Sequence, residues 1–228
     1  MKVFAVPVDF NTPFPRELFD IISPERRNRL SEFRRKEDKI RGLLSELLVR
    51  LVLDLYYGIH SHQIHIIING FGKPFLKNLP LHFNVSHSGK WIVAAVDDQS
   101  VGIDIEKIEP IDYQKISRSF FSNEEYTFIM DQQKQDQLMS FYSIWTGKES
   151  YLKATGQGLS VSLNSFSVCN DSGKIISNVS PGNEEWHLQS YNISPEYHLT
   201  VCSPSAVFPD KPVLFTLEEV IGHFVCKS

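Results

Sequence analysis

The spacing of apolar residues predicts two long helices. Leucine, isoleucine and valine recur at intervals of three and four over residues 40–55, and Gly58 would end that helix. Ser23 followed by Pro24 is a typical helix start, so a shorter helix is expected to begin there, ahead of the long helix. A second amphipathic pattern over residues 136–154 predicts the other long helix.

Shorter segments of alternating apolar and polar residues predict strands. A capping box, Ser122 followed three residues later by Glu125, marks a helix start in the middle of the chain. A final helix is expected over residues 217–225. The expected strands cover residues 2–9, 64–68, 83–85, 91–96, 101–106, 166–169, 175–176, 186–191 and 198–202.

The strand at residues 101–106, VGIDIE, carries the first candidate chemistry. Asp104 and Glu106 are two residues apart, so they share one face of a strand while Ile103 and Ile105 face a core on the other. Two adjacent carboxylates repel each other, and a hard divalent cation such as Mg²⁺ would relieve that repulsion. The alternative is a strand whose polar face meets only water.

The later long helix carries the second candidate, in the sequence WTGKESYLK from Trp145 to Lys153. Glu149 and Lys153 are four residues apart and share a helix face. Beside the two strand carboxylates, Glu149 would supply a third oxygen ligand and Lys153 a positive charge or a proton. On its own, the pair would be a solvated ion pair worth about 0.2–0.5 kcal/mol.

Two polar turns offer places for phosphate groups. Residues 84–89, NVSHSG, combine hydroxyls, backbone N–H groups and an imidazole, which suits a phosphate or, alternatively, a hairpin turn with a surface histidine. Residues 71–74, FGKP, combine a flexible glycine, a lysine and a stiff proline.

Composition restricts the class of protein. The chain has 228 residues, 42% of them hydrophobic, which suits one large domain or two small ones. The net charge of −4 argues against broad nucleic-acid binding, although basic residues crowd positions 26–50 and suit an anionic ligand. No leader pattern or membrane-length apolar run is present. Cys169, Cys202 and Cys226 lack metal-ligand spacing, so reduced thiols in a cytoplasmic protein are expected.

Together and in this order, these stretches resemble the 4′-phosphopantetheinyl transferases, specifically the surfactin-synthetase-activating class. The pair VGIDIE and WTGKES is the signature of that family. The resemblance extends over nearly the whole chain, through SPERRNR, KED, LLVR, FGKP, NVSHSGKW, VGIDIE, FFSNEEY and WTGKESYLKATGQGLS.

The resemblance implies a fold and an activity. The expected fold is α/β (α+β), with two similar subdomains related by a pseudo-twofold and the active site in the cleft between them. Residues 1–101 would contact the coenzyme A phosphates and adenine, and residues 102–228 would hold the metal site and the carrier. The implied reaction is Mg²⁺-dependent transfer of the 4′-phosphopantetheine arm of coenzyme A to a serine of an apo acyl or peptidyl carrier protein. It releases adenosine 3′,5′-bisphosphate and serves nonribosomal peptide and antibiotic biosynthesis.

The resemblance also implies roles for individual residues. Asp104, Glu106 and Glu149 would hold Mg²⁺, with Mn²⁺ able to replace it. Glu149 would also act as the base for the serine hydroxyl, directly or through water, and Lys153 would neutralise or protonate the departing phosphate. The implied coenzyme A contacts are Lys73, Pro74, Ser86 and His87 near the phosphates, Arg26 and Arg29 near the 3′-phosphate, and Arg41 near the adenine.

A carrier protein is expected to dock beside the exit of the 101–106 strand. The apolar residues that follow do not all fit one helical spacing, so some are expected to be exposed, as in a binding patch. Two lysines would meet acidic carrier residues at its rim. The proposed docking residues are Lys107, Ile111, Lys115, Ile116 and Phe120. A monomer without nucleic-acid or membrane partners is expected.

Two glycines depart from the family's pattern. Gly147 replaces a residue that is often larger, and Gly42 replaces a common polar residue and removes a possible adenine contact.

Two other functions remain open. The same three carboxylates would also suit a metal-dependent nucleotide phosphodiesterase that uses water. The basic segment at 26–50 would suit an anion-binding adaptor, whose nucleic-acid binding would depend steeply on salt.

Overall fold

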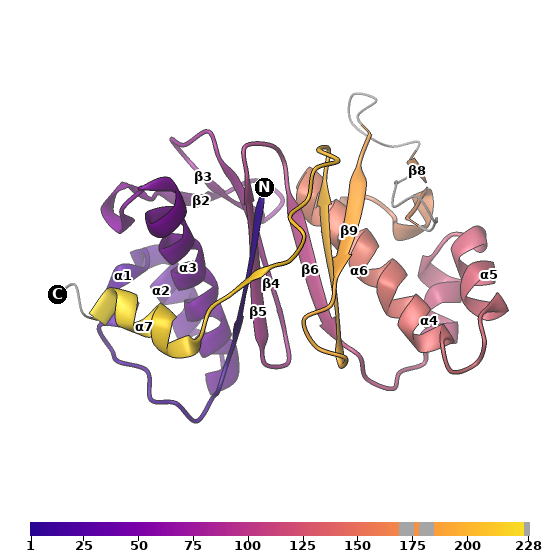
Figure 1. Ribbon diagram of the computed structural model, residues 1–228, viewed down its shortest axis with the longest axis horizontal. Coiled ribbons are helices and arrows are strands. Elements are labelled where there is room, and N and C mark those ends of the chain that lie inside the picture. Colours follow the sequence, from indigo (N-terminus) through magenta and orange to yellow (C-terminus); the bar gives the residue numbers. More distant parts are fainter. Residues whose placement is uncertain (169–175, 178–184, 226–228) are drawn as a thin grey trace.

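Two β-sheets pack face to face, and helices cover the outer face of each (Figure 1). The structure is a computed structural model that describes residues 1–168, 176–177 and 185–225. The layers therefore run helices, sheet, sheet, helices. Each sheet buries apolar side chains on both of its faces, one against helices and one against the other sheet.

The first half of the chain builds the first sheet and its helices. Its strands pair in the order β11-β1-β5-β4, with β1 antiparallel to β5 and β5 antiparallel to β4. Its elements are β1 (Lys2–Pro7), α1 (Leu18–Ile21), α2 (Pro24–Ser31), α3 (Lys36–Tyr57), the 3₁₀ helix η1 (Ser61–Gln63), β2 (Ile66–Ile68), β3 (Pro74–Leu76), β4 (His82–Ser88) and β5 (Trp91–Asp97).

The second half builds the second sheet, in the order β6-β10-β9 with antiparallel pairing. Its elements are β6 (Gly102–Lys107), α4 (Tyr113–Phe120), α5 (Asn123–Asp131), α6 (Gln137–Thr155), the 3₁₀ helices η2 (Gly158–Ser160) and η3 (Leu163–Ser165), β7 (Phe166–Ser167), β8 (Ile176–Ser177), β9 (His187–Tyr191) and β10 (Tyr197–Ser203), and the chain continues with β11 (Val213–Leu214) and α7 (Leu217–Val225).

The two halves repeat one topology. Each has a strand, three helices of which the third is the longest, a small two-stranded sheet, and two further antiparallel strands. In each half the first strand pairs with the last, so β1 with β5 corresponds to β6 with β10, and α3 corresponds to α6. This arrangement confirms the predicted α/β fold of two similar subdomains.

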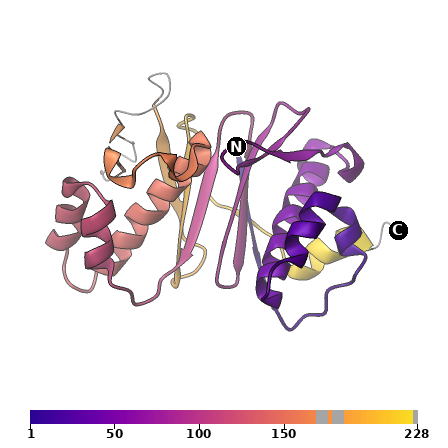
Figure 2. The same ribbon diagram turned by 180° about the vertical axis from the view of Figure 1, so that it is seen from behind.

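The last described segment returns to the first half. Strand β11 pairs in parallel with β1, and α7 packs against α1 and α3, as the view from behind also shows (Figure 2). The predicted division into residues 1–101 and 102–228 stays a prediction. The structure adds that 213–225 lie on the side of the first domain, because Leu217, Val220 and Phe224 complete its apolar core.

Local signals account for the ends of the main helices. The Ser23 side chain accepts a hydrogen bond from the backbone N–H of Arg26, which caps α2, and Gly58 ends α3 in the left-handed conformation. The capping box of Ser122 and Glu125 starts α5 as predicted. Both long helices therefore occur close to their predicted limits.

Several short elements differ from the sequence prediction. Strand β3 covers residues 74–76, although Pro74 was expected to belong to a turn, and β11 was not expected at all. The thiols of Cys169 and Cys226 lie outside the described residues, whereas Cys202 is a buried free thiol. In the part of the chain that the structure describes, every helix is too short or too polar to span a membrane.

Candidate active site

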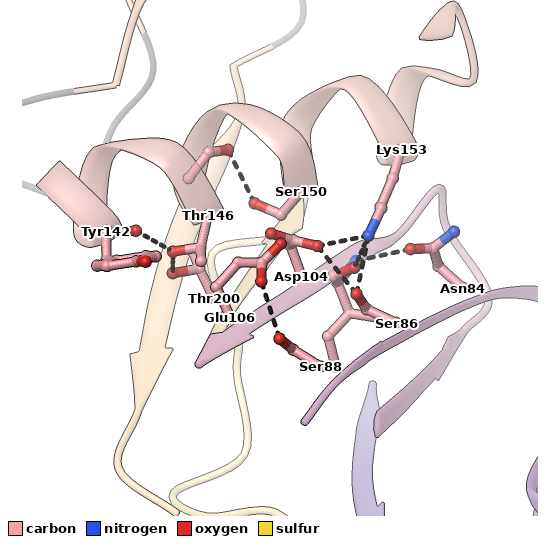
Figure 3. A network of polar contacts seen from close by, with 12 residues as sticks. Asn84, Ser86, Ser88, Asp104, Glu106, Tyr142, Thr146, Ser150, Lys153 and Thr200 are labelled. Carbon is pink, nitrogen blue, oxygen red and sulfur yellow. Dashed lines mark hydrogen bonds and ion pairs between the residues drawn. The ribbon is translucent and has the colours of Figure 1, made fainter. Parts of the chain in front are cut away.

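Strand β6 presents two carboxylates to α6. Ile103 and Ile105 are fully buried between the two sheets, whereas Asp104 and Glu106 point to the opposite face, toward the helix (Figure 3). This alternation follows from strand geometry and is the orientation that the sequence predicted. Asp104 is nevertheless only 3% exposed, so the polar face of this strand does not simply meet water.

Strand β4 meets β6 through polar side chains at every second residue. Asn84 Oδ1 accepts a hydrogen bond from the backbone N–H of Ile103 (2.9 Å). Ser88 Oγ accepts one from the backbone N–H of Lys107 (3.0 Å). These contacts satisfy backbone donors of β6. They also join the two halves of the molecule beside the carboxylates.

Helix α6 supplies two further charged groups. Glu149 and Lys153 lie about one turn apart, and the Lys153 ammonium donates to the Asp104 carboxylate (2.5 Å), the Ser86 hydroxyl (2.9 Å) and the Ile103 carbonyl (3.3 Å). The Ser86 hydroxyl in turn lies 2.9 Å from Asp104 Oδ1 (Figure 3). The predicted residues Ser86, Asp104 and Lys153 are thus in direct contact.

Burial and mutual repulsion act on the carboxylates. Burial, followed by the charge of Asp104, raises the pKa of Glu106 to about 7. The same two causes, in the same order, raise the pKa of Glu149, while Lys153 opposes the rise in both. Asp104 Oδ2 is buried and has no hydrogen-bond partner among the described residues. Excess negative charge beside an unused carboxylate oxygen suits a cation.

The predicted Mg²⁺ ligands lie in the same region but are not arranged as a complete metal-binding site. Among residues 1–168 and 185–225, no three His, Cys, Asp or Glu side chains are arranged to hold a metal ion. The Lys153 ammonium binds Asp104 Oδ1, and the Ser88 hydroxyl donates to Glu106 Oε2 (2.9 Å). The three carboxylates still offer the oxygen ligands that Mg²⁺ prefers, and Asp104 Oδ2 has no hydrogen-bond partner in the described part of the chain and could bind the ion. The predicted ligand set therefore fits the ion and stays a prediction.

Two adjoining cavities extend from these charges. The smaller, of about 260 Å³, is lined by Lys73, Asn84, Glu149 and Lys153 among others. The larger, of about 940 Å³, reaches Arg26 and Arg29 on α2. Both are bordered by Gly72, Pro74 and Val85, so one continuous groove joins Glu149 and Lys153 to the arginines of α2.

Some of the predicted coenzyme A contacts line the groove, whereas others have hydrogen bonds within the protein. Arg26, Arg29 and Pro74 line the groove, and burial lowers the pKa of Arg26. Lys73 also borders the groove, but its ammonium donates to the carbonyls of Ala154 (2.8 Å) and Val101 (3.4 Å), and burial lowers its pKa to about 8.

Arg41 does not line either cavity. Its guanidinium donates twice to the carbonyl of Gly89 (2.9 and 3.1 Å) and once to Asp38 (3.0 Å). His87 is exposed on the neighbouring strand β4. The structure thus gives Arg41 a contact with the β4–β5 turn, and its predicted adenine contact stays a prediction.

Comparisons with known proteins agree with this arrangement. The 4′-phosphopantetheinyl transferase superfamily matches residues 100–202, and the family described as the N-terminal part of 4′-phosphopantetheinyl transferase matches residues 14–99. The chain is 36% identical over 227 residues to the 4′-phosphopantetheinyl transferase Sfp of Bacillus subtilis (strain 168), which covers 97% of this chain and 100% of that protein. The chain belongs to the 4′-phosphopantetheinyl transferases.

Two other relatives carry the same activity in their names. The 4′-phosphopantetheinyl transferase psf-1 of Bacillus pumilus is 35% identical over 230 residues, covering 98% of this chain and 98% of that one. The 4′-phosphopantetheinyl transferase gsp of Aneurinibacillus migulanus is 40% identical over 145 residues, covering 64% and 60%. These matches confirm the predicted family and the predicted enzyme class.

The sequence prediction missed several polar residues of this phosphopantetheinyl transferase. Asn84 and Ser88 were included only as part of a turn, although their spacing of two from Ser86 would have placed all three on one strand face. Thr200 lies opposite Asp104 on β10, and its hydroxyl contacts that of Thr146 on α6 (2.8 Å). No short-range sequence signal points to this contact between distant segments.

The two unusual glycines have packing roles. A Cβ on Gly147 would lie 3.2 Å from the side chain of Val168 and 3.3 Å from that of Leu188, so glycine lets α6 approach the second sheet closely. A Cβ on Gly42 would collide with the side chain of Leu30. The carbonyl of Gly42 also accepts a hydrogen bond from Arg26 (3.1 Å), so glycine here fixes α2 against α3.

The proposed carrier-docking residues differ in exposure. Ile111 and Phe120 are 39% and 53% exposed, and Lys115 is exposed as well. Lys107 forms an ion pair with Glu109 (2.8 Å). Ile116, in contrast, packs against the apolar core of the second half, because it lies on the inner face of α4. Ile111 and Phe120 are thus exposed, Ile116 is only partly exposed, and the docking role of these residues stays a prediction.

Proposed function

We propose that this phosphopantetheinyl transferase carries out its reaction where β4, β6 and α6 meet. The reaction transfers the 4′-phosphopantetheine arm of coenzyme A to a serine of an apo carrier protein. The observation that carries the proposal is the groove. One end is lined by Glu149 and by Lys153, which pairs with Asp104, and the other end carries Arg26 and Arg29. A molecule with a reactive pyrophosphate at one end and a phosphorylated nucleoside at the other matches both ends.

Asp104, Glu106 and Glu149 are the proposed ligands of Mg²⁺, for which Mn²⁺ can substitute. When bound, the ion supplies positive charge that neutralises the pyrophosphate and the charge that develops during transfer. Three observations support this role: the unpaired Asp104 Oδ2, the raised pKa of Glu106 and Glu149, and the all-oxygen donor set. Phosphoryl transfer needs charge neutralisation and positioning more than covalent help from the protein.

Glu149 and Lys153 are the proposed acid–base and charge-balancing groups. The carrier serine oxygen forms a bond to the phosphorus next to the pantetheine arm, and the bond from that phosphorus to the adenosine 5′-phosphate oxygen breaks. The serine proton passes to Glu149, directly or through water, because burial and the charge of Asp104 raise the pKa of this carboxyl group and make it a better proton acceptor. Lys153, one turn away, neutralises or protonates the departing phosphate of adenosine 3′,5′-bisphosphate.

The basic end of the groove is the proposed coenzyme A nucleotide site. Arg26 and Arg29 line this end and would hold the 3′-phosphate. Ser86 and His87 on β4 would help to hold the nucleotide phosphates. Lys73 already caps carbonyls at the end of α6, so its contribution to phosphate binding would require its ammonium to leave Ala154. We expect Lys73→Ala to affect both coenzyme A binding and the seating of α6.

The proposed carrier-docking surface is formed by Lys107, Ile111, Lys115 and Phe120. These residues follow directly after Glu106 in the chain, so a carrier bound there would have its serine close to the carboxylates. Two lysines beside exposed apolar residues suit a partner with an apolar helix and acidic flanks. A cytoplasmic location, a monomeric state and a role in nonribosomal peptide or antibiotic synthesis stay predictions.

A mass-spectrometric assay tests the proposed reaction. The protein is mixed with Mg²⁺, coenzyme A and an apo carrier domain, and the carrier is weighed before and after the reaction. The expected result is a mass increase equal to one phosphopantetheine group, abolished by EDTA and restored by Mg²⁺ or Mn²⁺. Coenzyme A hydrolysis without any carrier would support a phosphodiesterase instead. Full activity in EDTA would remove the metal from the proposal.

A further inference from the structure

We propose that Ser88 is a positioning residue that orients the Glu106 carboxylate toward the cation site. This inference rests on the proposed function, since it concerns the same metal-dependent transfer. Ser88 was not among the predicted site residues. It lies at the end of β4, two residues after Ser86, and its side chain faces β6 (Figure 3).

The hydrogen bonds of the Ser88 hydroxyl determine what it can do. A hydroxyl has one proton to donate and two lone pairs that accept. Ser88 Oγ already accepts from the backbone N–H of Lys107 (3.0 Å). Its single proton is therefore available to Glu106 Oε2, 2.9 Å away. Because Lys107 follows Glu106 directly, Ser88 is bound to the β6 backbone and to the carboxylate beside it at the same time.

The turn that carries Ser88 is held by residues from two other elements. Arg41 on α3 donates two hydrogen bonds to the carbonyl of Gly89. The Tyr197 hydroxyl on β10 accepts one from the backbone N–H of Lys90 (3.2 Å). Gly89 adopts a φ of +52°, and a Cβ there would collide with the Tyr197 hydroxyl. The Ser88 hydroxyl is thus presented from a fixed turn.

The hydrogen bond from Ser88 occupies one particular oxygen of the Glu106 carboxylate. Oε2 is engaged by Ser88, and among the described residues no other hydrogen bond to this carboxylate is found, so Oε1 is the oxygen left for a cation. Ser86 contacts Asp104 in the same manner two residues earlier (2.9 Å). Two serines spaced by two on β4 therefore match two carboxylates spaced by two on β6. A carboxylate fixed in this way loses less rotational freedom when it binds a metal.

Asn84 provides a matched control. Its side chain accepts from the backbone N–H of Ile103 (2.9 Å), as Ser88 does from Lys107, so both residues join β4 to β6. Unlike Ser88, Asn84 has no contact with a carboxylate in the described structure. Replacing each with alanine removes one contact between the strands, but only Ser88→Ala also releases Glu106.

Direct Mn²⁺ binding tests the inference without relying on turnover. The dissociation constant of Mn²⁺ is measured by electron paramagnetic resonance for the wild type and three variants. Each protein is saturated with coenzyme A, because Asn84 lines the groove and its loss could weaken coenzyme A binding. Ser88→Ala is expected to weaken Mn²⁺ binding about tenfold or more, as for the loss of a charge-assisted hydrogen bond. Ser88→Thr keeps the hydroxyl and should remain near the wild-type value. Asn84→Ala should change it less than threefold.

The outcomes separate this inference from the proposed function. Unchanged Mn²⁺ affinity in Ser88→Ala, or an equal loss in Asn84→Ala, would overturn the role of Ser88 while leaving the metal site intact. A wild type that binds no Mn²⁺ would overturn the proposed metal site, and with it this inference. If Ser88→Ala does not fold, Ser88→Cys keeps the side-chain volume with a much weaker donor. Wild-type Mn²⁺ affinity in that variant would also contradict the proposal.

Discussion

The two halves of this enzyme use equivalent strands and helices for different purposes. Strand β1 in the first half corresponds to β6 in the second, and each pairs with the last strand of its own half. On β1, Phe4 and Val6 face the helix layer and are fully buried in an apolar core. On β6, Asp104 and Glu106 occupy the helix-facing positions instead. The fold therefore does not require carboxylates there.

The long helices show the same contrast. The face of α3 that meets the first sheet carries leucines, among them Leu44, Leu47 and Leu48, all fully buried. The face of α6 that meets the second sheet carries Lys153 and Glu149 beside the carboxylates of β6. Burying charged groups costs stability unless they are well paired. We infer that the first half mainly stabilises the fold, whereas the second half gives up stability to hold the reactive charges.

The largest expected effect separates activity from stability at equivalent strand positions. Asp104→Ala should lower transfer by about 10²- to 10³-fold or more, because it removes charge stabilisation of the transition state. It should leave the free energy of unfolding close to that of the wild type. Phe4→Ala should instead lower that free energy by about 3–5 kcal/mol through the cavity it leaves. Transfer is measured by carrier mass and stability by urea unfolding. A strongly destabilised Asp104→Ala protein would contradict the contrast between the two halves.

Two lysines on α6 provide the next comparison. The Lys148 side chain is fully buried, donates to Glu125 (2.8 Å) and to the carbonyls of Leu163 and Phe166, and lies against the Phe166 ring. Lys148→Met would remove the partner of the buried Glu125 carboxyl group, and breaking a buried pair in this way costs about 3–5 kcal/mol of folding free energy.

Lys153 differs because it faces the groove and is partly exposed. Lys153→Met should mainly lower kcat, with little change in the urea midpoint. Equal destabilisation by both substitutions would mean that Lys153 is also a structural residue, and would weaken its proposed role in phosphate release. Enzyme kinetics and urea unfolding on the same preparations decide between these results.

The sequence predicted the regular part of this architecture because local patterns specify it. The two long helices, the buried face of β6 and the capping box at Ser122 all follow from residue spacing and cap chemistry. The short strand β11 could not be predicted, since two residues carry no periodicity and their pairing with β1 joins opposite ends of the chain. The same holds for the contact of Arg41 with the Gly89 turn.

The candidate site was only partly predictable for a related reason. Asp104, Glu106, Glu149 and Lys153 each belong to a short motif whose spacing suggests chemistry. Ser88 contacts Glu106 and Thr200 contacts Thr146, and these tertiary contacts join segments that are distant in the sequence. Ile116 shows a related limit, since an irregular apolar run does not tell which side chains pack inward, and α4 turns this one partly onto the core.

The docking surface offers a smaller effect, limited to one half of the molecule. Ile111→Asp should raise the KM for the carrier about tenfold, which corresponds to losing one apolar contact of about 1.4 kcal/mol. Coenzyme A binding and thermal stability should stay near wild type, because Ile111 is exposed. Ile116→Asp is the matched control and should destabilise the protein, as its side chain packs on the core. Normal carrier kinetics in Ile111→Asp would move the docking surface elsewhere.

The smallest expected effect is a pH dependence that arises from Glu106 in the second half. The pKa of Glu106 is raised to about 7 by burial and by Asp104, whereas its ordinary value is 4.5. Without a cation, the folded state therefore holds this proton more tightly than the unfolded state. The stability that Glu106 contributes is present below pH 4.5 and is lost as pH rises through about 7. Metal binding competes with the same proton, so it should strengthen over that range.

Mn²⁺ titrations at several pH values test this competition. For one proton with a pKa of about 7, the half-saturating Mn²⁺ concentration should fall about threefold between pH 6.5 and 7.5 and change little above pH 8.5. Ser88→Thr should keep this profile, because the Glu106 hydrogen bond is retained. A profile that is flat from pH 6.5 to 7.5 would mean that Glu106 is already ionised in the folded protein. Burial and the charge of Asp104 would then raise the pKa of Glu106 less than the structure indicates.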